Sequence, residues 1–241
     1  MAPIVFLLII ALCFCAPALA ESPEPTMAQL IDMEQRGEDE KALLLTEQAL
    51  KKWPKCMFFY IFRARALGSV KRYDEALRLC HKAKAMSPTL FEIEDARSEI
   101  YNAMGKSAEA IAACTAALKL FPEDIGGRRL RARIYRQTGK LDLATADMTY
   151  LMNYEKAHHG AASARCRDLE LRGNMYMENK QYQQAVDDFS ALIKERIGYA
   201  EGYRLRASAY KAMGRTEEAK RDLYRASQTG DDWAPPSSIG R

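Results

Sequence analysis

The chain has 241 residues, of which 48% are hydrophobic and 28% charged, and its formal net charge is +4. So small a positive excess gives little electrostatic basis for binding nucleic acid, which favours strongly basic surfaces. We therefore expect no nucleic-acid partner.

Residues 1–20 have the pattern of a secretory signal peptide. They carry no charged side chain, are apolar from Ile4 to Leu12, and end in Ala18-Leu19-Ala20 before Glu21. An apolar segment followed by small-x-small residues is typical of a cleaved signal. We expect export to a periplasm or the exterior, with a mature chain that begins at Glu21. The alternative is an uncleaved anchor, since about 18 apolar residues can span a membrane; Pro17 favours cleavage.

Beyond the signal, no apolar run is long enough to cross a bilayer. We expect the mature domain, residues 21–233, to make no membrane contact. Residues 234–241 form a short tail.

Small residues and prolines repeat along the mature chain at equal steps. The same step separates the alanines Ala42, Ala76, Ala110 and Ala144 and the prolines Pro54, Pro88 and Pro122. After one longer step, Ala185 and Ala219 resume the original spacing. A unit of this length holds one helix pair, which cannot bury its apolar face alone and needs neighbours of the same kind.

A period of about 34 residues with aromatic, Gly, Ala, bulky and Pro positions resembles the tetratricopeptide repeat family. The turn positions hold Gly37, Lys71, Gly105, Gly139, Lys180 and Gly214. The position of the family's Phe holds Thr46, Cys80, Cys114, Met148, Phe189 and Leu223. The family's early Trp is absent, and the closing Pro is lost after the third unit, where Lys156 and Ile197 stand.

The resemblance implies an all-α fold, an α-solenoid superhelix of about six helix-turn-helix units. We expect these at residues 23–56, 57–90, 91–124, 125–158, 166–199 and 200–233. The longer step is an insertion at His159–Arg165, which we expect to lengthen a loop or a helix end and to allow a kink. Arrays of this family often end in an extra helix, which is missing here. Either Trp233 or a second chain would cover the last hairpin, so self-association is possible.

Four cysteines follow the signal, and an even number in an exported chain raises the question of disulfides. Cys80 and Cys114 occupy equivalent positions of adjacent units. Helices about 8–10 Å apart exceed the Cα reach of a disulfide, roughly 4.4–6.8 Å. We expect both to be small buried side chains, and the states of Cys56 and Cys166 stay open.

No catalytic or metal-binding constellation is recognisable. His81 adjoins Cys80 on a helix, where neighbouring side chains diverge, and His158 and His159 have no partner at ligand spacing. The chain has no glycine-rich phosphate loop and no nucleophile with an identifiable base. We expect no enzyme activity, no cofactor and no metal.

An arginine recurs in the first helix of five units. In the last three units an aspartate follows sixteen residues later: Asp147 after Arg131, Asp188 after Arg172 and Asp222 after Arg206. Both members of a pair lie in one hairpin, so we interpret them as ion pairs between its two helices. Arg63 and Arg97 have no such aspartate, which confines the ion pairs to the C-terminal half.

In tetratricopeptide arrays the first helices of successive units line a concave groove that binds protein or peptide ligands. Carried over by position, the groove residues are Met27, Ile31, Phe58, Ile61, Arg65, Glu92, Asp95, Glu99, Arg129, Arg133, Arg136, Glu170, Asn174, Met177, Arg204, Ser208 and Lys211. The family's clamp for a C-terminal carboxylate is absent, since Ile61 with Arg65 and Asp95 with Glu99 occupy its positions.

Two features of this face could select a ligand. Charge alternates through Asp95, Arg129, Glu170 and Arg204, and Glu99 similarly faces Arg133, so neighbouring helices could pair across the groove floor. Met27, Ile31, Phe58 and Ile61 could form an apolar patch that anchors a partner, or could instead complete the core of the first two units.

The sequence thus predicts an exported scaffold that binds a protein or peptide. The alternative is a structural module that assembles through its last hairpin.

Overall fold

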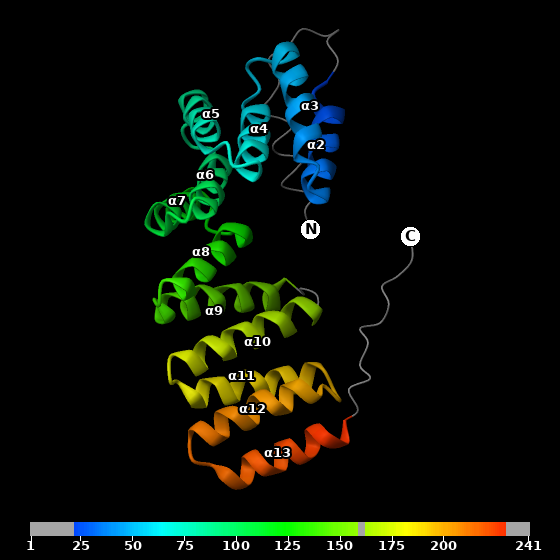
Figure 1. The fold of residues 1–241 in the computed structure, drawn as a ribbon, viewed down its shortest axis with the longest axis vertical. Coiled ribbons are helices and arrows are strands. Elements are labelled where there is room, and N and C mark those ends of the chain that lie inside the picture. Colours follow the sequence, from blue (N-terminus) through cyan, green and yellow to red (C-terminus); the bar gives the residue numbers. More distant parts are fainter. Residues whose placement is uncertain (1–21, 159–161, 230–241) are drawn as a thin grey trace. The chain divides into compact units, whose positions relative to one another are not determined.

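The computed structural model describes residues 22–158 and 162–229, and within those ranges every regular element is an α-helix (Figure 1). The predicted signal peptide and the tail with Trp233 lie outside the described residues. The helices form six consecutive pairs: α2 (Glu24–Arg36) with α3 (Asp39–Lys52), α4 (Met57–Ser69) with α5 (Tyr73–Met86), α6 (Phe91–Ala103) with α7 (Ser107–Leu120), α8 (Ile125–Gln137) with α9 (Leu141–Ala157), α10 (Ala162–Glu178) with α11 (Tyr182–Glu195), and α12 (Ala200–Ala212) with α13 (Thr216–Gln228).

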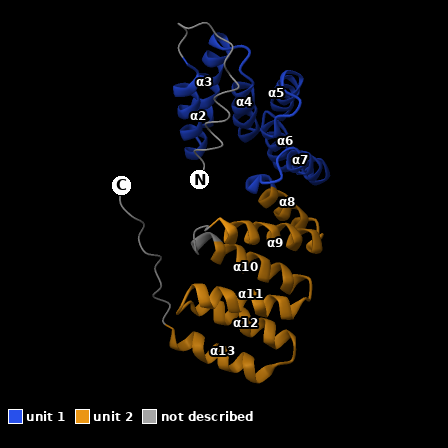
Figure 2. Ribbon diagram, turned by 180° about the vertical axis from the view of Figure 1, so that it is seen from behind, with its two compact units in different colours: residues 1–127 blue, residues 128–241 orange. Residues whose placement is uncertain are grey.

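The chain forms two compact units, residues 1–127 and 128–241 (Figure 2). The division falls in the first turn of α8 and not at the insertion of residues 159–165. In each unit, second helices pack on the first helix of the next pair, as α3 does on α4 and α11 on α12.

The six turn positions share one backbone conformation. Gly37, Gly105, Gly139 and Gly214 have φ between 67° and 76°, and Lys71 and Lys180 have φ of 63° and 59°. In each turn the next N–H donates to the carbonyl five residues before it, as in the bond from Lys106 to Tyr101. This is the Schellman arrangement, which requires a left-handed residue after the helix. The turn positions predicted from the spacing are therefore confirmed.

Replacing Lys180 by glycine is expected to raise the free energy of unfolding by up to about 1 kcal/mol, because the left-handed conformation costs a residue with a Cβ about that much. Urea denaturation of the variant measures the change. Gly139→Ala is the matched reverse control: no atom lies within 4 Å of the added Cβ, so any loss comes from the backbone alone. If the urea midpoint of Lys180→Gly equals that of wild type, the left-handed conformation of Lys180 does not have the expected cost.

Proline decides where several second helices end. The helices α3, α5 and α7 each stop two residues before Pro54, Pro88 or Pro122. The residue before a proline avoids the helical region, and Ser87, for example, has φ −144° and ψ 88°. Lys156 stands where the next proline would fall, and α9 continues through it to Ala157.

The insertion lengthens helices on both sides. Helix α9 has 17 residues where α3, α5, α7 and α11 have 14, and α10 also has 17 where other first helices have 13. The expected lengthening of a helix end is therefore confirmed for both neighbours.

The small residues of the repeat lie where helices approach closely. All six repeat alanines are buried, with exposures of 6% or less. All four described cysteines are buried as well, which confirms the prediction for Cys80 and Cys114. Burial raises the pKa of the Cys80 thiol to about 12, so Cys80 is not a reactive nucleophile.

Candidate functional site

The predicted apolar patch is part of the core. Met27, Phe58 and Ile61 are 6%, 9% and 3% exposed, and Ile31 is half-buried. The reason is the position of α4, which contacts four helices, α2, α3, α5 and α6, so nearly every side of it is covered. These side chains therefore complete the core of the first two hairpins. The prediction that they form an exposed apolar patch that anchors a partner is wrong.

Side chains of three first helices meet at Arg65, which lies on α4. Its Nη2 donates to Asp95 Oδ2 at 2.7 Å, its Nη1 lies 3.4 Å from Glu34 Oε1, and its Nε lies 3.2 Å from Glu99 Oε2. The Arg65 side chain is 22% exposed and Asp95 is 15% exposed, whereas half of Glu99 faces solvent. One guanidinium is therefore shared by three carboxylates.

Two further carboxylates border this group. Asp124 is 8% exposed; its Oδ1 accepts the Gly127 N–H at 3.1 Å, while its buried Oδ2 has no hydrogen-bond partner. Glu92 Oε2 is also buried without a partner. We name Glu34, Arg65, Glu92, Asp95, Glu99 and Asp124 the Arg65 cluster. Five carboxylates and one guanidinium give it a formal charge of −4.

The pKa of Asp95 is raised to about 7. Burial is the main cause, and the negative charges of Glu99, Asp124 and Glu92 add to it, while Arg65 opposes it. Burial likewise raises the pKa values of Glu99 and Glu92. These three carboxyls of the cluster are therefore protonated more readily than carboxyls in water.

The contribution of Asp95 to stability is expected to fall as pH rises from about 4 to about 7. The folded chain binds this proton more tightly than the unfolded chain does, and that advantage disappears once the folded carboxyl ionises. Urea denaturation across this range should show wild type losing stability relative to Asp95→Asn. Asp74→Asn, on the exposed surface of α5, is the control and should give a constant difference. If the difference in the free energy of unfolding between wild type and Asp95→Asn is also constant across this pH range, the raised pKa is contradicted.

A cavity of about 110 Å³ adjoins the cluster. It lies between the first two hairpins, and both Glu34 and Arg65 line it. Its apolar walls come from Leu30, Phe62 and Ala66. The first unit therefore combines a small apolar recess with adjacent unneutralised carboxylates.

In the second unit the charges do not pair in the predicted order. Arg129 on α8 lies 3.1 Å from Glu155 and donates to Asp168, which is 2% exposed, at 2.9 Å. Glu170 instead accepts a hydrogen bond from the Tyr199 hydroxyl at 3.3 Å. The predicted pairing of Arg129 with Glu170 is wrong, because the carboxylate two residues earlier on α10 is the one that faces Arg129.

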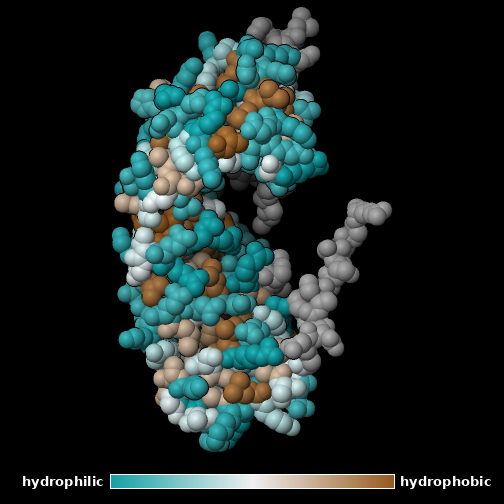
Figure 3. All heavy atoms as spheres, viewed as in Figure 1, coloured by the Kyte–Doolittle hydropathy of each residue, from teal (hydrophilic) through white to brown (hydrophobic). Residues whose placement is uncertain are grey.

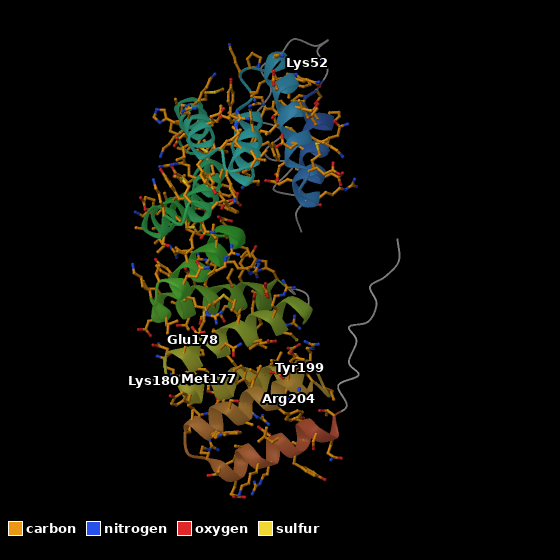
Figure 4. All side chains as sticks on the ribbon, viewed as in Figure 1. Lys52, Met177, Glu178, Lys180, Tyr199 and Arg204 are labelled. Atoms are coloured by element: carbon orange, nitrogen blue, oxygen red, sulfur yellow. The ribbon has the colours of Figure 1, made fainter. Side chains whose placement is uncertain are left out.

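Other predicted residues of this unit lie apart from one another. Arg204 pairs with Glu201 on its own helix, and Arg136 pairs with Glu178 across α8 and α10. In Figure 4, Glu178 lies near the turn after α10, at the opposite end of the hairpins from Tyr199 and Arg204. Arg133 and Lys211 are exposed, and Asn174 is half-buried. Asp95 and Arg129 belong to different units, and so do Glu99 and Arg133. The pairing of charges between these residues stays a prediction.

The predicted ion pairs within hairpins are confirmed in all three cases. Each arginine donates two hydrogen bonds to its aspartate, at 2.8 and 2.7 Å in the fourth hairpin, 2.8 and 2.6 Å in the fifth, and 2.7 and 2.8 Å in the sixth. Among the described residues of the first unit the recurring arginine has other partners: Arg63 donates to the Leu43 carbonyl and Arg97 to Glu94.

Two members of the Arg65 cluster were missed by the positional argument. Glu34 lies three residues after Ile31 on α2, on the same helix face, and the i, i+3 rule could have found it. Asp124 directly precedes Ile125-Gly126-Gly127, and an aspartate before a helix start is an N-cap signal. Neither signal reveals that the two lie near Arg65.

Within the described ranges, no group of three or more His, Cys, Asp and Glu side chains has the geometry of a metal site. Of the helices described, none is both long and apolar enough to cross a bilayer. On the face shown in Figure 3, hydrophobic residues form small separate groups among hydrophilic ones.

Comparisons with known proteins agree on the fold. Residues 96–148 match the model of the tetratricopeptide repeat family. A DnaJ homolog subfamily C member 7 homolog from Schizosaccharomyces pombe is 26% identical over 166 residues, 64% of this chain and 34% of that protein. Human tetratricopeptide repeat protein 13 is 22% identical over 152 residues, 61% of this chain and 16% of that protein. The chain thus spans only about a third and about a sixth of these curated relatives.

Three solved structures superpose on the chain with a TM-score of 0.61 each. YrrB, described as a TPR protein with an unusual peptide-binding site, is 18% identical and covers 78% of this chain and 93% of its own. PilW, a type IV pilus biogenesis factor, is 18% identical with coverages of 88% and 94%, and MamA is 14% identical with coverages of 77% and 97%. Residues 96–148 match the tetratricopeptide repeat family, and the chain has the fold of that family's proteins, an all-α solenoid of helix-turn-helix units.

Proposed function

We propose that this chain is an exported scaffold that binds a protein or peptide partner, and that the first-helix face of the first unit is the binding surface. Proteins with tetratricopeptide repeats generally act as protein-interaction scaffolds. The observation that carries the proposal is the Arg65 cluster, in which α2, α4 and α6 direct charged side chains to one place and leave carboxylate oxygens unpaired. Unpaired buried polar atoms cost stability, so their presence favours a use outside the fold.

The test is capture of the partner by the mature chain from its own compartment, compared between two charge reversals. Glu99→Lys changes an exposed side chain of the cluster. Glu109→Lys makes the same change on the exposed surface of α7, a second helix. We expect mass spectrometry to identify a protein that the Glu109→Lys variant captures as wild type does and that the Glu99→Lys variant does not capture. Equal capture by both variants, or no specific capture by wild type, would overturn the proposal.

Export rests on residues 1–20 and is part of the same proposal. N-terminal sequencing of the native protein should find Glu21 as the first residue. A membrane-bound species that retains Met1 would instead show a tethered chain.

A second candidate is assembly through the last described hairpin. On α13 the side chains of Leu223 and Tyr224 are 53% and 67% exposed, whereas the repeat positions equivalent to Leu223 are fully buried in the other five hairpins. Exposed apolar side chains at the end of a repeat array favour association. Sedimentation across concentration should show self-association that Leu223→Ser with Tyr224→Ser removes. A chain that stays monomeric at all concentrations would exclude this role.

A further inference from the structure

The Arg65 cluster has an unusual excess of carboxylates for a half-buried site. Three of them share one guanidinium, and Asp124, which is only 8% exposed, has an Oδ2 with no partner. A buried carboxylate oxygen without a donor is costly. Such an oxygen can accept a hydrogen bond from a cationic donor.

The unpaired oxygen of Asp124 is directed toward the rest of the cluster. The point where a Cβ on residue 127 would stand lies 2.1 Å from Asp124 Oδ2 and 3.4 Å from Asp95 Oδ1. Asp124 Oδ2 therefore takes up the space that a side chain at residue 127 would fill, and Asp95 Oδ1 lies beside it. The other oxygen, Asp124 Oδ1, is occupied in capping α8.

The recess beside the cluster fits an aliphatic stem. Its volume of about 110 Å³ is lined by Leu30, Phe62 and Ala66, and Glu34 and Arg65 also line it. Lysine and arginine side chains bury their methylene groups against apolar surface and place their charged end on carboxylates.

We propose that the Arg65 cluster is a socket for one lysine or arginine side chain of the protein partner. This inference rests on the proposed function and specifies the chemistry of its ligand. The cationic end of that side chain contacts Asp95, Glu99 and Asp124, and its methylene groups enter the recess. A partner with a basic residue exposed in an extended segment is thereby preferred over an acidic or purely apolar one.

The probe for a direct test is Nα-acetyl-lysine methylamide, titrated into the mature chain at low ionic strength and followed by NMR of the Asp and Glu carboxyl carbons. Nα-acetyl-norleucine methylamide, which has the same stem without the ammonium, is the control ligand. We expect saturable shifts at Asp95 and Glu99 with the lysine probe and none with norleucine. No saturable shift, or equal shifts with both probes, would overturn the proposal.

Two variants locate the site. Asp124→Asn keeps the oxygen that caps α8 but removes the unpaired anionic one, and it should weaken binding of the lysine probe about tenfold. Glu99→Gln, at a position that is half exposed, should weaken it as well. Asp74→Asn on α5 should leave binding unchanged. Equal affinities for Asp124→Asn, Glu99→Gln and Asp74→Asn would overturn the assignment.

The outcomes separate the socket from the scaffold. If CaCl₂ shifts the same carboxyl resonances while the lysine probe does not, the cluster is a metal site and the socket is wrong. If the lysine probe fails but partner capture still depends on Glu99, the scaffold stands and the socket is wrong. If the probe binds but capture ignores Glu99→Lys, the cation site stands and the proposed binding surface is wrong.

Discussion

Asp188→Ala is expected to lower the free energy of unfolding by about 3–5 kcal/mol, the usual cost of removing one partner from a buried ion pair. Asp188 is 4% exposed and accepts two hydrogen bonds from Arg172, at 2.8 and 2.6 Å. The remaining Nη1 of Arg172 donates to Thr149 Oγ1 at 2.9 Å, so this guanidinium joins α9, α10 and α11. Without the aspartate, its charge would stay largely buried and uncompensated.

Burial raises the pKa of Asp188, which indicates that removing the ionised carboxyl from water costs more than Arg172 returns. The double replacement Arg172→Met with Asp188→Leu should therefore recover most of the lost stability. Asp187→Ala, at the exposed neighbouring position, is the matched control and should change stability by less than about 0.5 kcal/mol. Urea denaturation measures all three variants, and an Asp188→Ala loss no larger than the control's would show that the pair is not structural.

The backbone of the repeat was predictable because its signals are local. A left-handed turn, a proline stop and a buried alanine each depend on a few neighbouring residues, and the regular repeat spacing identifies them even where Lys71 or Lys180 replaces glycine. The hairpin ion pairs were predictable for the same reason, since both partners lie in one unit and recur at a fixed separation.

The candidate site was less predictable because it depends on helix rotation and side-chain reach. Equivalent sequence positions suggested that Arg129 faces Glu170, yet Asp168 and, from the second helix α9, Glu155 are its partners. The apolar first part of α4 could not be assigned from sequence either to the core or to a surface, and only the contacts of α4 with four helices decided this. Asp124 lies at the start of α8, and none of the repeat positions predicts that this helix start packs beside the cluster.

Helix α10 contains a glycine whose replacement tests the packing of the fifth hairpin. Gly173 is buried, and a Cβ added there would lie 2.5 Å from one ring atom of Phe189 and 2.9 Å from two others. Phe189 is fully buried and is the one phenylalanine at a repeat position that holds Thr, Cys, Met or Leu in the other units. The missing side chain at Gly173 is thus what makes room for the ring.

Gly173→Ala is accordingly expected to destabilise the chain by about 1–2 kcal/mol. Alanine gains up to about 1 kcal/mol over glycine within a helix, but overpacking a rigid buried ring costs about 1–3 kcal/mol. Adding Phe189→Leu should make Gly173→Ala favourable, because the shorter side chain leaves space for the new methyl group. A double-mutant cycle by urea denaturation gives the coupling between the two positions. Gly126→Ala on α8, where the nearest atom lies 3.5 Å from the added Cβ, is the control without a clash. Independent effects of the two substitutions would mean that Phe189 can move aside, and that the glycine is not what fixes its position.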